Sequence, residues 1–173
     1  MSETGPSLTV DQKEKIVMVS GRTHTELAEL TADYIGVKLF PTILGRHEDG
    51  ELKVQIDESV RGKHVYVHQA HYHQPDFSID SAISEHRFLV ASASRGDAEE
   101  VTASATYWGY SRSDRKSKPR EPTGSAITMA DFEQFGPKRL MGFDLHSQPT
   151  QSFFRGVFVQ MTAFLNTIKS CQN

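Results

Sequence analysis

The sequence has one cysteine, Cys171, one tryptophan and no long hydrophobic run. A single cysteine excludes an intrachain disulfide and is typical of a reducing compartment, so we expect a cytoplasmic protein. No apolar stretch approaches the ~20 residues of a membrane-spanning helix, and residues 1–14 lack the apolar core of a signal peptide. We therefore expect no membrane association. The net charge of −3 also argues against nucleic acid as a partner.

What is present fits one globular domain. The chain has 173 residues, of which 37% are hydrophobic and 24% are charged. This length is sufficient for one domain with its own hydrophobic core. The composition of the first fourteen residues is polar, so we expect residues 1–14 to be a flexible tail and residues 15–173 to be a single domain.

Short apolar runs alternate along the chain with segments of helical spacing. Strands are expected over residues 15–19, 37–40, 51–56, 64–68, 101–107 and 140–144. Helices are expected over residues 25–35, 77–94, 123–135 and 157–168. This alternation predicts an α/β fold with a mainly parallel sheet and helices on both of its faces.

A strongly basic segment runs from Tyr110 to Glu121, directly after the strand expected over residues 101–107. Open α/β sheets usually bind ligands at the carboxyl ends of their strands. Lysine and arginine there would neutralise a polyphosphate, because guanidinium groups bind phosphate oxygens in a bidentate manner. The alternative is a solvated charged loop. The basic residues are Arg112, Arg115, Lys116, Lys118 and Arg120.

Two further segments carry chemical interest. Asp49-Gly50 is a hairpin turn signal, and residues 51–56 alternate with Leu52, Val54 and Ile56 on one face. We therefore expect a projecting hairpin near residues 49–60.

Asp144 and His146 lie at the end of the strand expected over residues 140–144. They would share one face of an extended segment, where they would hold a divalent cation. The histidines at positions 64, 68, 71 and 73 show no recognisable zinc spacing, so we interpret them as structural or surface residues.

Three motifs occur in order between about Val17 and about Phe154. They are Asp-Gly-Glu with Glu-Ser-Val-Arg-Gly, Gly-Tyr-Ser-Arg-Ser-Asp-Arg-Lys with Pro-Arg-Glu-Pro, and Asp-Leu-His with Gln-Ser-Phe-Phe. Together they resemble the N-terminal half of the ribose-phosphate pyrophosphokinases, or phosphoribosyl-pyrophosphate synthetases. The resemblance implies a phosphoribosyltransferase-like three-layer domain with a flag hairpin. It also implies magnesium-dependent transfer of a pyrophosphoryl group from ATP to ribose 5-phosphate.

The resemblance implies an ATP site built on two segments. Asp49 and Glu51 would lie at the adenine on a flag hairpin presented by a neighbouring subunit, and His47 stands where the family usually has a stacking phenylalanine. Arg112 would contact the ATP phosphates, and His146 would lie at the magnesium–ATP complex. The implied ATP-binding residues are His47, Asp49, Glu51, Arg112, Ser113, Asp114, Arg115, Lys116 and Lys118.

The resemblance also implies regulation and assembly. Ser59, Arg61 and Gln151 match positions that line the family's regulatory phosphate or ADP site. The flag hairpin implies a homo-oligomer, or a hetero-assembly with a complete synthetase.

The sequence departs from the family in ways that affect the ATP site. Ser113 and Ser117 stand where glutamine and aspartate are usual, and residues 69–80 lack the usual Asn-Asp-Asn-type helix start. These 173 residues also lack the Thr-Gly-Gly-type loop by which the family's second half binds ribose 5-phosphate. We therefore expect an ATP-side half that is not active alone. The alternatives are a non-catalytic associated subunit of a synthetase assembly and a stand-alone nucleotide- or phosphate-binding module.

Overall fold

The computed structural model describes residues 8–162. Within this range six strands form one sheet in the order β2-β1-β5-β6-β7-β8, and every neighbouring pair is parallel. The predicted parallel sheet is confirmed. Its strands are β1 (Ile16–Ser20), β2 (Lys38–Phe40), β5 (His64–His68), β6 (Glu100–Ala105), β7 (Arg139–Phe143) and β8 (Val157–Met161).

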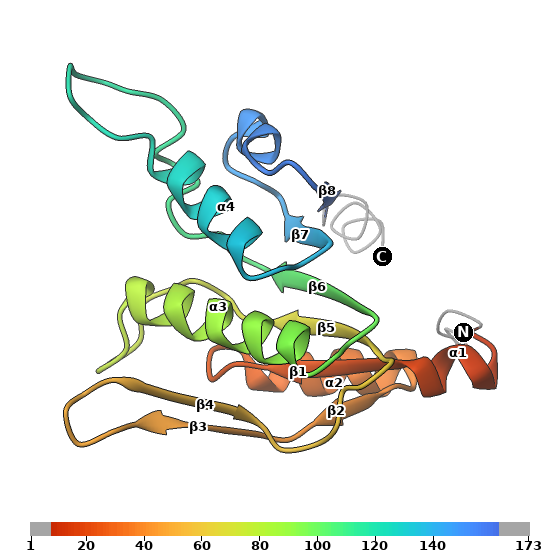
Figure 1. Cartoon of the computed structure of the whole chain (residues 1–173). Helices are drawn as coiled ribbons and strands as arrows, with labels where there is room; N and C mark the ends of the chain where they lie inside the picture. Colours follow the sequence, from red (N-terminus) through yellow and green to blue (C-terminus); the bar gives the residue numbers. More distant parts are fainter. Residues whose placement is uncertain (1–7, 163–173) are drawn as a thin grey trace, which may run out of the picture.

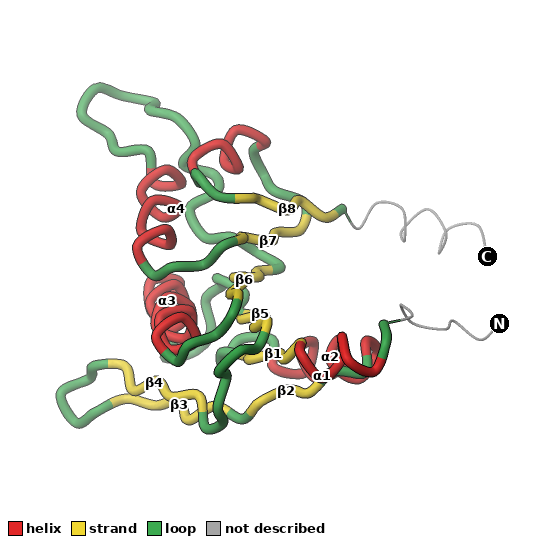
Figure 2. Tube along the Cα trace, turned by 45° about the vertical axis from the view of Figure 1, so that its right-hand side comes forward, coloured by secondary structure: helices red, strands yellow, loops and turns green. Residues whose placement is uncertain are grey.

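Helices cover both faces of the sheet, so the three-layer prediction is confirmed. Helix α2 (Thr25–Ile35) lies on one face, and helices α3 (Ile79–Arg95) and α4 (Gly124–Gln134) lie on the other (Figures 1 and 2). The alternation of side chains along β1 divides the core accordingly. Met18 packs against α2, whereas Val17 and Val19 belong to the larger core beneath α3 and α4.

A separate antiparallel hairpin joins β2 to β5. It consists of β3 (Thr42–Arg46) and β4 (Leu52–Ile56), and Asp49-Gly50 lies in the connecting turn as predicted. Gly50 has φ +91°, which glycine tolerates and other residues rarely adopt. The hairpin spans residues 42–56, so the predicted range of 49–60 began and ended too late in the chain. Strand β3 was not predicted, because it has few alternating apolar residues.

The apolar row of β4 is partly covered by its own chain. Strand β4 lies along α3, and Val54 and Ile56 pack against the larger core together with Leu44. Val54 and Ile56 are therefore half-buried in the single chain rather than exposed.

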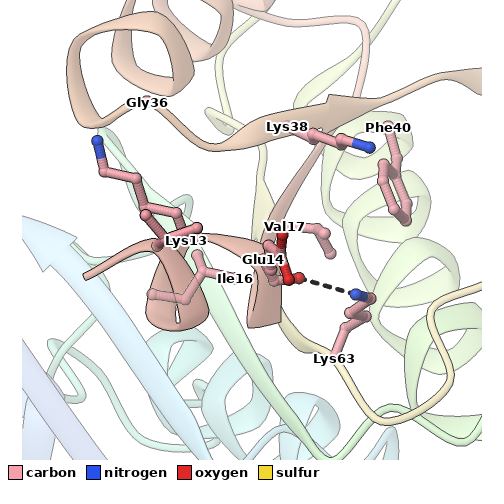
Figure 3. A pocket seen from close by; sticks show the side chains of 9 residues that line it. Lys13, Glu14, Ile16, Val17, Gly36, Lys38, Phe40 and Lys63 are labelled. Carbon is pink, nitrogen blue, oxygen red and sulfur yellow. Dashed lines mark hydrogen bonds between the residues drawn. The ribbon is translucent and has the colours of Figure 1, made fainter. Parts of the chain in front are cut away.

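The expectation of a flexible tail up to residue 14 was wrong for residues 10–14. They belong to helix α1 (Val10–Lys15), which starts with a capping box between Thr9 and Gln12. Lys63 Nζ donates to the carbonyl of Glu14 (2.7 Å) at the end of this helix (Figure 3). Helix α1 buries no residue, so it has no apolar periodicity by which it could have been predicted. Residues 1–7 lie outside the described range.

The helix expected over residues 157–168 was also wrong in its first part. Val157–Met161 is strand β8, which pairs in parallel with β7. Apolar residues at 157 and 161 fit a helical period, but Val159 between them completes the alternation of a strand. Residues 163–168 lie outside the described range. Between β7 and β8 lies a 3-10 helix, η1 (Gln148–Phe153). No helix in residues 8–162 is long and apolar enough to cross a membrane.

Candidate functional site

Two of the predicted motifs meet at one edge of the sheet. Strands β6 and β7 are parallel neighbours, so their carboxyl ends lie side by side. The loops that follow them enclose a pocket of about 250 Å³. Arg112 from the basic segment lines this pocket together with Asp144 and His146. The other lining residues are Thr106, Tyr107, Trp108, Ser111, Phe143 and Leu145.

The sequence suggested that Asp144 and His146 share one face of a strand. The structure shows that they do not. Strand β7 ends at Phe143, and Asp144 has a left-handed backbone with φ 40°. The chain then turns, and both residues nevertheless line the same pocket. Asp144 Oδ1 accepts a hydrogen bond from Thr162 Oγ1 (3.0 Å), which holds this carboxylate near the end of β8.

A hydrogen bond joins the two loops directly. Ser147 Oγ donates to Asp114 Oδ2 (2.6 Å), and this bond is the main reason that the pKa of Asp114 is lowered. The nearby positive charge of Arg115 lowers the pKa further. Asp114 is therefore a carboxylate at neutral pH and ties the basic segment to the loop that carries His146.

The cations of the basic segment are available to an anion. Within residues 8–162, none of the five basic side chains forms an ion pair. All five are exposed. The loop is shaped instead by Glu121, whose Oε2 accepts hydrogen bonds from the backbone amides of Ser117 and Lys118 (2.9 Å each). Arg112 lines the pocket itself, and the other four cations follow it in the same loop, so the segment favours binding of phosphate groups.

Ser113 has a structural contact that the sequence analysis did not anticipate. Its Oγ accepts from the backbone amide of Gly124 (3.0 Å), and its carbonyl accepts from the amide and hydroxyl of Ser125 (3.1 and 3.0 Å). Helix α4 has no side-chain hydrogen bond from its N-cap residue, Thr123, so Ser113 supplies the missing acceptors. An ATP-binding role for Ser113 stays a prediction.

The tip of the hairpin carries the predicted adenine-side residues. The turn is closed by hydrogen bonds from His47 N to Glu51 O (2.8 Å) and from Glu51 N to Asp49 Oδ1 (3.0 Å). His47, Asp49 and Glu51 are exposed. In both views the tip lies well away from the basic loop, so a single chain does not bring the two segments together (Figures 1 and 2).

The predicted regulatory residues are also separated within one chain. Ser59 lines a groove between β4 and the end of α3, and Arg61 lies 3.5 Å from Asp97 in an exposed ion pair. Both residues precede β5, at the amino end of the sheet. Gln151 lies in η1, after the carboxyl end of β7, where it contacts Gln148.

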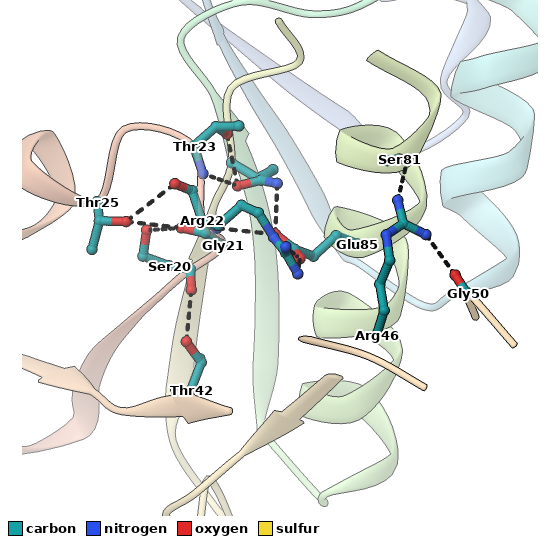
Figure 4. A network of polar contacts seen from close by, with 11 residues as sticks. Ser20, Gly21, Arg22, Thr23, Thr25, Thr42, Arg46, Gly50, Ser81 and Glu85 are labelled. Carbon is teal, nitrogen blue, oxygen red and sulfur yellow. Dashed lines mark hydrogen bonds and ion pairs between the residues drawn. The ribbon is translucent and has the colours of Figure 1, made fainter. Parts of the chain in front are cut away.

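A buried ion pair beside the carboxyl end of β1 was missed from the sequence. Arg22 Nε and Nη2 each lie 2.7 Å from Glu85 Oε2, and Glu85 is fully buried (Figure 4). Gln69 Nε2 and the Arg22 amide donate to Glu85 Oε1 (3.0 and 2.9 Å). The Arg22 guanidinium stacks over Phe77 at 4.4 Å. The signal was the helical spacing of α3, which places Glu85 on the same side as Ala82 and Leu89.

Two buried histidines form a chain of hydrogen bonds beneath the basic segment. His86 Nε2 donates to Val67 O (3.1 Å), so His86 Nδ1 must accept from His71 Nε2 (2.9 Å). His71 Nδ1 then accepts from the Gly109 amide (3.2 Å). Both rings are neutral, because burial lowers the pKa of His86 to about 3 and that of His71 well below its ordinary value. Trp108 packs against both rings.

The structural interpretation of the histidines agrees with this arrangement. His68 is also buried, and its pKa is lowered to about 4, mainly by desolvation. His73 is exposed and His64 is half-buried. The described residues contain no group of three or more histidine, cysteine, aspartate or glutamate side chains that could hold a metal ion.

Comparison with known proteins identifies the family. A family profile described as the N-terminal domain of ribose phosphate pyrophosphokinase matches residues 16–136. The chain belongs to the ribose-phosphate pyrophosphokinase family. The matched residues include the hairpin and the basic segment, whereas His146 and Gln151 lie beyond them.

Curated ribose-phosphate pyrophosphokinases from two bacteria match this chain with similar sequence identity. The enzyme of Bifidobacterium longum is 36% identical over 143 residues, which are 83% of this chain and 41% of the relative. That of Prochlorococcus marinus is 35% identical over 81% of this chain and 41% of the relative. The chain thus spans about two fifths of the length of these relatives.

A solved structure supports the same assignment. The phosphoribosylpyrophosphate synthetase of Mycobacterium smegmatis superposes with a TM-score of 0.84 at 29% identity. The superposition covers 92% of this chain and 53% of the other. The chain therefore shares its fold with part of this synthetase over nearly its whole length.

Proposed function

We propose that this chain is the ATP-side half of a ribose-phosphate pyrophosphokinase, which binds magnesium–ATP for pyrophosphoryl transfer to ribose 5-phosphate. The pocket between the loops after β6 and β7 carries this proposal. Arg112 and His146 line it, and four further exposed cations follow Arg112 in the same loop. Transfer of phosphoryl-type groups depends on positioning and charge neutralisation more than on covalent catalysis. Arginine and lysine side chains supply both.

The pocket fits a magnesium ion that arrives with the nucleotide. Mg²⁺ usually keeps several waters and is held by one or two carboxylates together with substrate phosphates. Asp144 and His146 line the pocket, and Asp114 is joined to the loop that carries His146 by its bond to Ser147. Bound there, magnesium would neutralise charge on the transferring phosphates. The residues of this chain would orient the polyphosphate and hold the loops around it.

The separation of the hairpin tip from the basic loop favours an assembly. His47, Asp49 and Glu51 would reach a nucleotide only on a second chain, and Ser59 with Arg61 would meet Gln151 only in the same way. We therefore propose a homo-oligomer or a hetero-assembly with a complete synthetase. Phosphate or ADP would bind at the shared regulatory surface.

Two features favour an associated, non-catalytic subunit as the second candidate. The Ser113 hydroxyl accepts from the Gly124 amide in α4, and His47 offers a weaker stacking surface than phenylalanine. Both features would weaken nucleotide binding without altering the fold.

We expect the purified chain to form no phosphoribosyl pyrophosphate from magnesium–ATP and ribose 5-phosphate. These 173 residues contain no recognisable ribose 5-phosphate loop, and alignment of both substrates accounts for much of the catalysis. A coupled phosphoribosyltransferase assay is the measurement. Steady product formation by this chain alone would contradict the half-enzyme proposal. A changed rate when the chain is added to a complete synthetase would favour the associated subunit.

A further inference from the structure

The first turn of α3 contacts the tip of the hairpin. Arg46, the last residue of β3, donates from Nη1 to Gly50 O (2.6 Å) and from Nη2 to Ser81 Oγ (2.9 Å) (Figure 4). One guanidinium thus joins the closing turn of the hairpin to the helix. Ser81 is well placed for this, because its amide is fixed by the N-cap residue Ser78 (3.1 Å).

The same turn of α3 contacts the start of the basic segment. Tyr110 OH donates to Asp80 Oδ1 (2.6 Å), and Asp80 is the residue directly before Ser81. Tyr110 has a left-handed backbone with φ 61°, a conformation that is strained for a tyrosine. Its phenol is held strongly enough to raise the pKa of Tyr110 above its ordinary value.

The root of the basic segment is packed closely on the same helix. A side chain at Gly109 would lie 2.9 Å from Ile83 Cδ1 and 3.1 Å from Ile79 Cγ2, so only glycine allows this approach. The Gly109 amide is also bound by His71. The root of the loop is therefore closely packed on α3, and Tyr110 and Arg46, although exposed, each form a hydrogen bond to the first turn of this helix.

We propose that Asp80 and Ser81 are positioning residues that couple the orientation of the hairpin tip to that of the basic segment. The connection runs from Tyr110 through adjacent residues of α3 to Arg46 and Gly50. Only the purpose of this coupling rests on the proposed function. If both segments bind nucleotides, the coupling would align them. The coupling itself exists in the protein without a ligand.

Amide hydrogen exchange of the ligand-free chain tests this coupling. Tyr110→Phe removes the bond to Asp80 and touches no residue of the hairpin. It should nevertheless speed exchange at His47, Gly50 and Glu51 by about threefold to tenfold, the range that corresponds to one exposed hydrogen bond. Ser81→Ala should also speed exchange at the hairpin tip. In addition, it should speed exchange at Ser113, whose amide donates to Tyr110 O. Coupling between sites is reciprocal, so both directions must appear.

Three matched variants sharpen the result. Ser81→Thr keeps a hydroxyl acceptor and should restore the parent rate. Ser84→Ala lies one turn further along α3 and should leave the hairpin tip unchanged, as should Tyr34→Phe on α2. The proposal is overturned if Tyr110→Phe leaves the tip at the parent rate, or if Ser84→Ala accelerates it equally. Because no nucleotide is present, failure of ATP binding would leave this outcome unaffected.

Discussion

Each buried histidine takes its role from the groups around it, which the sequence alone does not display. His71 and His86 are neutral because they are desolvated and because each nitrogen already has a suitable partner. The resemblance to the family implied one site for Arg112 and His146, and both line the pocket at the ends of β6 and β7. Arg22 and Glu85 could not be paired from the sequence, because 63 positions separate them and only the folded chain brings them together.

Acid should destabilise the protein through these histidines. The pKa values of His68 and His86 in the fold are about 4 and about 3, whereas the unfolded chain takes up protons near 6.5. The unfolded state therefore binds more protons between these values, and stability falls as pH decreases through this window. Each histidine contributes up to about 1.4 kcal/mol per pH unit.

Urea unfolding between pH 8 and pH 4.5, followed by Trp108 fluorescence, measures this effect. Trp108 is the only tryptophan and is buried beside His71 and His86. His68→Asn should remove the contribution of one histidine from the slope of the unfolding free energy against pH. His73→Asn, at an exposed position, should leave this slope unchanged. A free energy of unfolding that stays constant from pH 7 to pH 4.5 would contradict the neutral buried histidines.

At the scale of elements, the central strands and the three longest helices were predictable from apolar spacing. Strands β1, β5, β6 and β7 are short, apolar and bounded by turns. The errors are the missed strand β3 and the two ends of the described chain. Helix α1 has caps and a contact with Lys63 but no apolar face, and β8 has a pattern that fits two periods. For β8 the pairing with β7 decides between them.

The ion pair that fastens the loop after β1 to α3 should contribute measurably to stability. Glu85→Ala leaves the Arg22 guanidinium and the Gln69 amide without their acceptor, which should destabilise the fold by about 3–5 kcal/mol. Glu85→Gln keeps an acceptor and should be less harmful. Glu29→Ala, at an exposed position of α2, should change stability by less than about 0.5 kcal/mol. Equal chemical-denaturation midpoints for Glu85→Ala and Glu29→Ala would rule out this role for the pair.

At the scale of the whole molecule, the basic segment and the hairpin tip lie in different places (Figures 1 and 2). The basic segment stands beside the pocket of its own chain, and the hairpin tip extends away from it along α3. The first was predictable because motif and strand end coincide. The hairpin could be predicted from its turn signal. Its position could not, because the packing of β4 along α3 decides it. A nucleotide held by both segments requires a second chain, which connects the fold to assembly.

The central claim is that the basic segment and its pocket bind magnesium–ATP. Partly exposed charge-assisted bonds are each worth about 1.5–3 kcal/mol, offset by ordering of the loop. We expect ATP to bind more tightly than ADP, and ADP more tightly than phosphate. With His47, Ser113 and Ser117 departing from the family, the expected dissociation constant for ATP is about 0.1–1 mM.

Titration calorimetry of magnesium–ATP into the parent chain and Arg112→Ala tests this claim most directly. Arg112→Ala should weaken binding by roughly tenfold, or ~1.4 kcal/mol, whereas Arg155→Ala, a control at an exposed arginine, should bind as the parent does. Added salt should weaken binding by the parent chain. If the parent binds ATP no better than chloride, or if Arg112→Ala binds as tightly as the parent, the basic segment is only a solvated loop.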